Sequence, residues 1–187
     1  MTFVRLDADQ VPLYVAELAD LMVDTVDGGA SIGFLAPFDR AAAVAWWQER
    51  AAAVAAGHLA LWIARGDDRT LGTVGLVFPD KPNSRHRAEL VKLMVHRDAR
   101  GRGLGRGLLA TAEQAAADAG RTLLHLDTET DSPAERLYAS AGWTRAGVIP
   151  DYAADPGGVL RGTTLYYKHL GAAAGQGKHP GTTAPTR

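Results

Sequence analysis

A buried strand that runs directly into a glycine-rich turn is the feature that most constrains the fold. Residues 87–95 read Arg-Ala-Glu-Leu-Val-Lys-Leu-Met-Val and are apolar on both faces apart from Glu89 and Lys92. Such a strand is typical of the interior of a sheet that is covered on two sides. Four glycines at alternate positions follow it: Gly101, Gly103, Gly105 and Gly107. We therefore expect a central strand, a tight turn and then a helix over about 103–119.

The other segments predict strands and helices in a mixed order. Hydrophobic periodicity predicts strands over 2–6, 58–64, 70–77, 123–128, 143–152 and 160–169, and helices over 11–26, 40–56 and 133–140. Asp9 and Asp39 are the expected N-caps of the first two helices. We expect the inner face of the second helix to be Val44, Trp47, Ala51 and Val54. This order predicts an α+β fold with one helix-covered sheet, not a doubly wound nucleotide fold.

Length and composition exclude several classes of function. The 187 residues fit one domain, and the net charge of −1 gives no bulk attraction to nucleic acid or to an anionic membrane. The absence of cysteine excludes disulfides, thiolate metal ligands and a cysteine nucleophile, and the six histidines lack ligand spacing, so we expect no metal site. Without a recognisable signal peptide or membrane span, we expect a cytoplasmic protein.

The C-terminal segment differs from the rest in composition. Residues 171–187 contain no Val, Leu, Ile, Phe, Tyr or Trp. Such a segment cannot bury enough apolar surface to offset the entropy of ordering it. We therefore expect one folded domain over 1–170 and a disordered tail over 171–187.

The turn before the third helix has the properties of a phosphate site. A helix N-terminus has unpaired N–H groups and partial positive charge, and glycines let the backbone approach an anion closely. Arg100, Arg102 and Arg106 add positive charge. No three glycines here have the dinucleotide-binding spacing, and the Walker sequence is absent.

The pattern that fits is Arg100-x-x-Gly103-x-Gly105, which resembles the pyrophosphate-binding loop of the GNAT N-acetyltransferases. The hairpin before it, the segment Leu-Tyr-Ala-Ser-Ala-Gly-Trp at 137–143 and the two closing strands agree with this resemblance. It implies a mixed, mostly antiparallel sheet of about seven strands with helices on both faces. The sheet would be splayed at its middle to admit the pantetheine arm of acetyl-CoA. Within the superfamily, residues 87–95, 124–129 and 162–168 most resemble the tabtoxin-resistance acetyltransferases.

The resemblance also implies which residues bind the cosubstrate. The strand after Glu89 would bulge and present free backbone N–H groups to the thioester. At Asp131-Ser132-Pro133 the sequence departs from the family, many of whose members have an asparagine there. The implied acetyl-CoA contacts are Leu93, Met94, Val95, Arg100, Gly101, Arg102, Gly103, Leu104, Gly105, Arg106 and Ser132.

Three residues are the candidates for catalysis by direct acyl transfer, which needs neither a metal nor a covalent enzyme intermediate. Glu89 or Asp127 would accept the proton of the amine, directly or through water, and Tyr138 would protonate the leaving thiolate. Each also has an ordinary alternative: Glu89 as a structural carboxylate paired with Lys92 or Arg87, Asp127 as a turn residue, Tyr138 as a core residue. His125 fits a satisfied histidine better than a base.

The expected reaction is therefore transfer of acetyl from acetyl-CoA to an amine of a small, amino-acid-like or antibiotic-like molecule, in detoxification or resistance. One alternative is acetylation of a protein or peptide amine. Another is a non-catalytic acyl-CoA-binding or RNA-contacting module that uses the cluster 97–106, although the net charge opposes RNA. We expect the acceptor cleft at 28–38 and near Tyr152 and Tyr166, with Trp47 at its border, and homodimer formation is compatible with the sequence.

Overall fold

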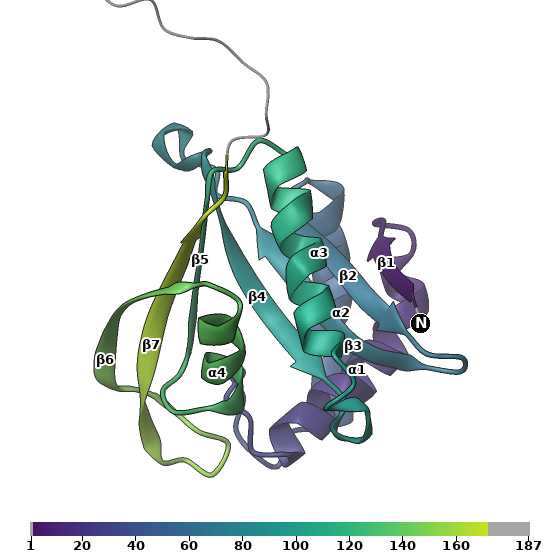
Figure 1. The fold of residues 1–187 in the computed structure, drawn as a ribbon. Coiled ribbons are helices and arrows are strands. Elements are labelled where there is room, and N and C mark those ends of the chain that lie inside the picture. The colour runs from purple at the N-terminus through teal and green to yellow at the C-terminus, as the bar shows by residue number, and fades with distance from the viewer. Residues whose placement is uncertain (1, 172–187) are drawn as a thin grey trace, which may run out of the picture.

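The computed structural model describes residues 2–171 (Figure 1). The strands are β1 (Thr2–Leu6), β2 (Leu59–Arg65), β3 (Thr70–Val77), β4 (Arg87–Val95), β5 (Leu123–Glu129), β6 (Thr144–Ala154) and β7 (Leu160–His169). The α-helices are α1 (Val11–Asp27), α2 (Arg40–Ala55), α3 (Leu104–Asp118) and α4 (Pro133–Ser140), and two short 3-10 helices are η1 (Pro82–Ser84) and η2 (Arg97–Ala99). The tail predicted over 171–187 lies, from residue 172 onward, outside the described residues.

The seven strands form one sheet in the order β1-β2-β3-β4-β5-β7-β6. Every neighbouring pair is antiparallel except β4 and β5, which are parallel and are joined through α3. Strand β7 is placed between β5 and β6, so β6 is an edge strand. The predicted α+β class with a mixed, mostly antiparallel seven-stranded sheet is therefore confirmed.

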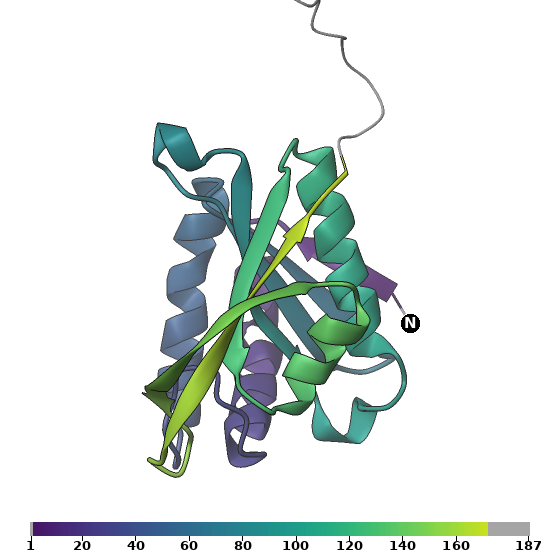
Figure 2. The ribbon, with the colours of Figure 1, turned by 60° about the vertical axis from the view of Figure 1, so that its left-hand side comes forward.

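Helices cover both faces of the sheet, as predicted (Figure 2). Helices α3 and α4 pack on one face through a core that includes Leu108, Leu124 and Tyr138. Helices α1 and α2 pack on the other face around Leu18 and Trp47. Because helices lie on both sides, β2 and β3 are buried along almost their whole length. The two cores hold the central strands in place, and these strands position the site described below.

Two local predictions at the N-terminal helices need correction. Asp9 does not cap α1, because the chain turns one residue later: the N–H groups of Gln10 and Val11 both donate to the carbonyl of Asp7, and Gln10 is the N-cap. Asp39 does cap α2, accepting from Ala41 N–H at 3.1 Å. The fully buried residues of α2 are Ala43 and Trp47, whereas three of the expected inner residues are only half-buried (Val44, Ala51, Val54).

Strand β4 carries a bulge in its second half. Val91 lies opposite Gly75 and Met94 lies opposite Thr73, so three steps along β4 match two along β3. Lys92 takes up the extra residue with a left-handed φ of 51°. A bulge changes which side chains face each side of the sheet. Ala88 and Leu90 face α3 before the bulge, whereas Leu93 and Val95 do so after it.

Beyond Glu89, β4 also separates from β5. The two strands pair only over Arg87–Glu89, opposite Leu123–His125. From Leu90 onward no described strand pairs with β4 on that side, whereas β5 pairs with β7 on its other edge along its whole length. The predicted splay is therefore present, and it begins at the third residue of β4.

The bulge leaves no room for a side chain at Gly72 of β3. A Cβ atom there would lie 2.8 Å from the carbonyl oxygen of Met94 and 2.9 Å from Leu108 Cδ1. Because overpacking a core typically costs about 1–3 kcal/mol, Gly72→Ala should lower the free energy of unfolding by that amount in a urea titration. Gly147→Ala in β6 is the matched control, since a Cβ there meets nothing within 4 Å, and its effect should stay within about 0.5 kcal/mol. Equal effects would contradict this packing.

Candidate active site

The glycine-rich turn forms an open cradle at the N-terminus of α3. Gly103 is the N-cap of α3 with a φ of 80°, and Gly101 has a φ of 76°. A Cβ at either position would meet nothing within 4 Å. Gly103 provides no side-chain cap, so the first N–H groups of α3 have no side-chain partner. This exposed, positively polarised backbone fits an anion such as a pyrophosphate.

The other two glycines of the motif have packing roles. A Cβ at Gly105 would lie 3.2 Å from the side chain of Leu137, where α3 meets α4. A Cβ at Gly107 would lie 2.3 Å from the ring of Phe3 in β1. Leu104 is buried, so only its backbone is available to a ligand. The alternation of glycines therefore combines two requirements, an open turn and a closely packed first helical turn.

Arginines around the turn divide into anchors and exposed charges. Arg106 donates to Ser140 Oγ at 2.8 Å and so joins α3 to α4. Arg97 donates from Nε and from its backbone N–H to Asp24 of α1, at 2.8 and 3.0 Å. Burial raises the pKa of Asp24, but the hydrogen bonds from Arg97 outweigh this and the pKa is lowered overall. Arg100 and Arg102 are exposed beside the cradle, and Arg100 Nε donates to the carbonyl of Val95 at 3.2 Å.

The open side of β4 presents unpaired peptide groups next to this cradle. His96 N–H donates to the carbonyl of Leu71 in β3. Because peptide groups alternate in direction along a strand, those of Met94 also face β3, whereas those of Leu93 and Val95 face the gap toward β5. Of the three residues predicted to meet a thioester, Leu93 and Val95 therefore have backbone N–H groups in a suitable position. The side chain of Met94 packs in the core beneath α1 and α2.

The candidate carboxylates lie where β4 and β5 begin to separate. Glu89 is opposite His125, and in the described part of the chain it forms neither an ion pair nor a hydrogen bond. The predicted structural pairing of Glu89 with Lys92 or Arg87 is therefore not observed. Asp127, two residues further along β5, is exposed and accepts a hydrogen bond from Thr163 Oγ1 at 3.3 Å.

His125 is occupied by a different interaction. Its Nε2 lies 2.6 Å from Arg87 Nη1, and an arginine can only donate. Burial lowers the pKa of His125, and Arg87 lowers it further against the opposing charges of Glu89 and Asp127. Its one acceptor nitrogen already receives a hydrogen bond, so His125 is not a free base, in agreement with the sequence analysis.

Tyr138 lies in α4 with its side chain 5% exposed. Burial raises its pKa above the ordinary value of a phenol, and the nearby negative charge of Asp127 raises it further. The phenol therefore keeps its proton at neutral pH. Ser132, the other predicted site residue of this segment, is the N-cap of α4 and accepts from Glu135 N–H at 3.1 Å, so its hydroxyl has a structural role.

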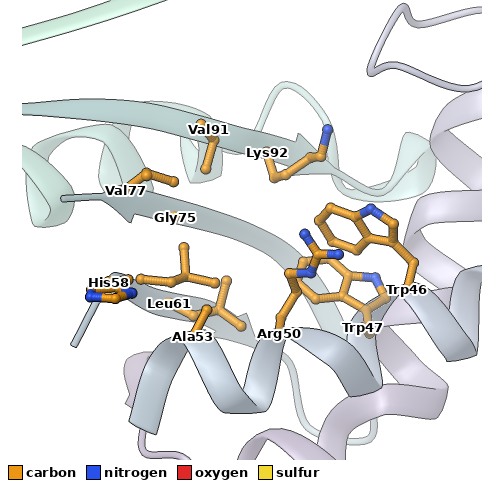
Figure 3. Close-up of a pocket in the computed structure, with 11 residues that line it drawn as sticks. Trp46, Trp47, Arg50, Ala53, His58, Leu61, Gly75, Val77, Val91 and Lys92 are labelled. Carbon is orange, nitrogen blue, oxygen red and sulfur yellow. The ribbon is translucent and has the colours of Figure 1, made fainter. Parts of the chain in front are cut away.

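A pocket of about 360 Å³ lies between α2 and the sheet, on the opposite face from α3 (Figure 3). Lys92 and Arg50 lie near Trp46 at one end, and apolar side chains form the walls. Trp47 borders this pocket, as the sequence analysis predicted for the acceptor cleft. The loop 28–38 reaches the same region, since Lys92 Nζ donates to the carbonyl of Ile32, and Ala36 N–H donates to Pro156 beyond β6. The sequence analysis did not identify Arg50 as a pocket residue, because a charged side chain on a helix usually points into solvent.

Comparison with known proteins decides which fold family this geometry represents. The sequence profile of the acetyltransferase (GNAT) family matches residues 29–143. The chain belongs to the GNAT acetyltransferase family. Among curated GNAT relatives, human N-acetyltransferase 8B is 35% identical over 46% of this chain and 39% of its own length. Rat N-acetyltransferase 8F1 is 29% identical over 66% of this chain and 51% of its own length. The matched region therefore spans 39% and 51% of the length of these two relatives.

Solved GNAT structures share the whole fold. Ribosomal-protein-alanine N-acetyltransferase from Brucella melitensis superposes with a TM-score of 0.72 and 21% identity, covering 91% of this chain and 100% of its own. The yncA protein of Salmonella typhimurium, solved with its cofactor acetyl-CoA, has a TM-score of 0.72 and 21% identity, covering 93% of this chain and 96% of its own. At this identity the likeness concerns the fold.

Residues 2–171 contain neither a candidate membrane span nor a candidate metal site. No described helix combines the length and the apolar character needed to cross a bilayer. Among the same residues, no three His, Asp or Glu side chains gather closely enough to ligate a metal ion.

Proposed function

We propose that this GNAT protein transfers the acetyl group of acetyl-CoA to an amine. One observation carries the proposal: the open cradle of Gly101 and Gly103 follows the same strand, β4, that has no partner strand on the β5 side after Glu89. A pyrophosphate fits the cradle and an extended pantetheine arm fits along the open strand. The acetyl-CoA bound to the yncA protein supports this choice of cosubstrate.

The chemistry follows from the placement of the side chains and the backbone. Acetyl-CoA supplies the acetyl group as a thioester. Glu89 or Asp127 removes a proton from the ammonium form of the acceptor, so that the nitrogen lone pair can attack the thioester carbon. The N–H group of Leu93 or Val95 stabilises the negative charge that develops on the carbonyl oxygen. As the carbon–sulfur bond breaks, Tyr138 donates its proton to the sulfur, which leaves as the thiol. The attacking nitrogen loses its second proton to solvent, and solvent reprotonates the phenolate.

We propose a small molecule as the acceptor, because the pocket beneath α2 is lined mainly by apolar side chains and its volume of about 360 Å³ suits a small molecule. The resemblance to the tabtoxin-resistance acetyltransferases supports an amino-acid-like or antibiotic-like acceptor and a role in detoxification or resistance. A protein amine is the second candidate, supported by the ribosomal-protein-alanine acetyltransferase among the structural neighbours.

We propose that residues 1–170 form the acetyltransferase domain, that 171–187 lie outside it, and that the protein acts in the cytoplasm. Exposed apolar side chains on the edge strand β6, Val148, Ile149 and Tyr152, support a homodimer formed through this edge.

The cradle can be tested with two glycines of matched geometry. Gly103 and Gly120 lie at opposite ends of α3, both have left-handed φ, and a Cβ at either meets nothing within 4 Å. Alanine therefore imposes the same backbone strain at both positions. In calorimetry with acetyl-CoA, Gly103→Ala should weaken binding at least about tenfold, because its methyl group enters the cradle. Gly120→Ala should leave affinity unchanged. Equal affinities for the two variants would refute the assignment of the cradle.

The base can be identified from pH profiles of Glu89→Gln and Asp127→Asn. Loss of the base should lower kcat/KM near neutral pH by about 10²-fold or more and make the rate rise with pH, as the free amine becomes abundant. Asp118→Asn, on the exposed side of α3, should behave like the wild type. If both variants and their combination keep the wild-type profile, neither carboxylate is the base.

The acid role of Tyr138 predicts a specific loss on removal of its hydroxyl. Tyr138→Phe keeps the ring and its packing, so acetyl-CoA affinity should be retained while kcat falls about 10²-fold or more. Tyr14→Phe on α1, at the opposite face of the sheet, is the control and should retain full kcat. An unchanged kcat for Tyr138→Phe, with chemistry shown to be rate-limiting by single-turnover measurement, would make Tyr138 a purely structural residue.

A further inference from the structure

Two cationic side chains meet at one end of an otherwise apolar pocket. Lys92 extends from the bulge of β4, and Arg50 extends from α2 (Figure 3). Between α2 and the sheet, the walls are formed mainly by apolar side chains: Trp47, Ala53, Leu59, Leu61, Val77 and Val91. At the other end His58 already has a carboxylate partner, Asp80, at 3.1 Å. The lysine and the arginine among the residues that line the pocket therefore both lie at the end next to the bulge.

Lys92 is held in place without an ion pair. Its Nζ donates to the carbonyl of Ile32 at 2.7 Å and lies 5.3 and 5.4 Å from the ring centroids of Trp46 and Phe34. In the described part of the chain no carboxylate forms an ion pair with it. Burial lowers the pKa of Lys92 and the positive charge of Arg50 lowers it further, while the negative charges of Asp127 and Glu89 oppose this shift. An anion bound at this end would relieve the repulsion between the two cations.

Arg50 has an unused donor at the same place. Its guanidinium lies 4.2 Å from the ring centroid of Trp46 and its Nη2 pairs at 3.0 Å with Glu49, whose side chain is 70% exposed. Its Nε is buried and has no hydrogen-bond partner. Because this Nε is closed to solvent, a ligand in the pocket would be met by the terminal Nη atoms of Arg50, whose side chain lines the pocket.

We propose that Lys92 and Arg50 bind the carboxylate of the acceptor, whose apolar part fills the pocket beneath α2. This inference rests on the proposed acetyl transfer and narrows the acceptor to an amphipathic amino acid with an apolar side chain. Its amine would then lie toward Glu89 and Asp127, the two carboxylates whose charges act on Lys92 from the splay. Trp46, which contacts both cations, would fix the distance between the carboxylate site and the apolar walls.

The carboxylate site can be tested by binding alone, without turnover. The probes are 3-phenylpropionate and the isosteric neutral 3-phenylpropanamide, measured by calorimetry on the full chain. Because hydrogen bonds to a charged group contribute about 1.5–3 kcal/mol, the wild type should bind the acid at least about tenfold more tightly than the amide. Lys92→Met and Arg50→Met should each remove most of this preference. Lys81→Met, an exposed lysine outside the pocket, should preserve it.

Using both Lys92→Met and Arg50→Met separates loss of the carboxylate site from an indirect change in the loop that contains Ile32. Lys92→Met also removes the hydrogen bond to Ile32, whereas Arg50→Met leaves that bond in place, so loss of the preference in both variants identifies the carboxylate site. Equal binding of acid and amide by the wild type, no binding of either probe, or a preference that survives in both variants would overturn the proposal.

Kinetics then separate this proposal from the proposed function. With acetyl-CoA, the wild type should acetylate L-phenylalanine with a kcat/KM at least about tenfold above that for phenethylamine, which lacks the carboxylate. In Arg50→Met the advantage should disappear through a higher KM for L-phenylalanine. Turnover of both amines without a preference would overturn the carboxylate site and leave acetyl transfer standing. Preferential binding of 3-phenylpropionate without turnover of any amine would instead overturn the proposed function.

Discussion

The separation of β4 from β5 after Glu89 is the constraint on which the rest of the site depends. In a fully paired sheet, the peptide groups of Leu93 and Val95 would be used by the neighbouring strand. Pairing with β5 stops at Glu89, so the N–H groups of Leu93 and Val95 have no partner strand on that side of β4, while Arg100 Nε donates to the carbonyl of Val95. Unpaired peptide groups in a sheet interior are costly, so a ligand that can accept their hydrogen bonds gains the corresponding free energy.

Arginine side chains in and beside the glycine-rich turn anchor it to the neighbouring helices and to β4. Arg97 joins it to α1, Arg106 joins the first turn of α3 to α4, and Arg100 contacts the end of β4. A fixed turn can present its N–H groups without paying the entropy of ordering them when an anion binds. The anchors therefore allow Gly101 and Gly103 to remain open while the chain on either side is packed.

Much of the fold could be predicted because the informative signals are local. Strand periodicity, the glycine turn and the Asp39 cap each depend on a few neighbouring residues, and the strands and helices were correctly located. The wrong prediction of Asp9 as the N-cap shows the limit of such signals. The backbone N–H groups of Gln10 and Val11 both donate to the carbonyl of Asp7, and side-chain preferences at the helix start do not predict this arrangement. The packing roles of Gly105 and Gly107 depend on Leu137 and Phe3, which are distant in sequence.

The acceptor side of the site shows the same limit more strongly. The sequence shows Lys92 only as a charge within a buried strand. Its partners Ile32, Phe34 and Trp46 come from a loop and a helix that lie 46 to 60 residues earlier. Arg50 gave no signal, since its significance lies in its place in the lining of the pocket. Local sequence therefore predicts the proposed cosubstrate site, whereas in the proposed acceptor site it predicts the loop 28–38 and Trp47 but not the pair Lys92 and Arg50, which depends on tertiary contacts.

A crystal structure of the complex with acetyl-CoA would test the central claim most directly. The account predicts the pyrophosphate at Gly101 and Gly103, the pantetheine arm along the open side of β4, and the thioester oxygen within hydrogen-bond distance of the N–H group of Leu93 or Val95. Tyr138 Oη should then lie close to the sulfur. A pantetheine arm bound elsewhere, or β4 and β5 paired along their whole length in the complex, would contradict the account.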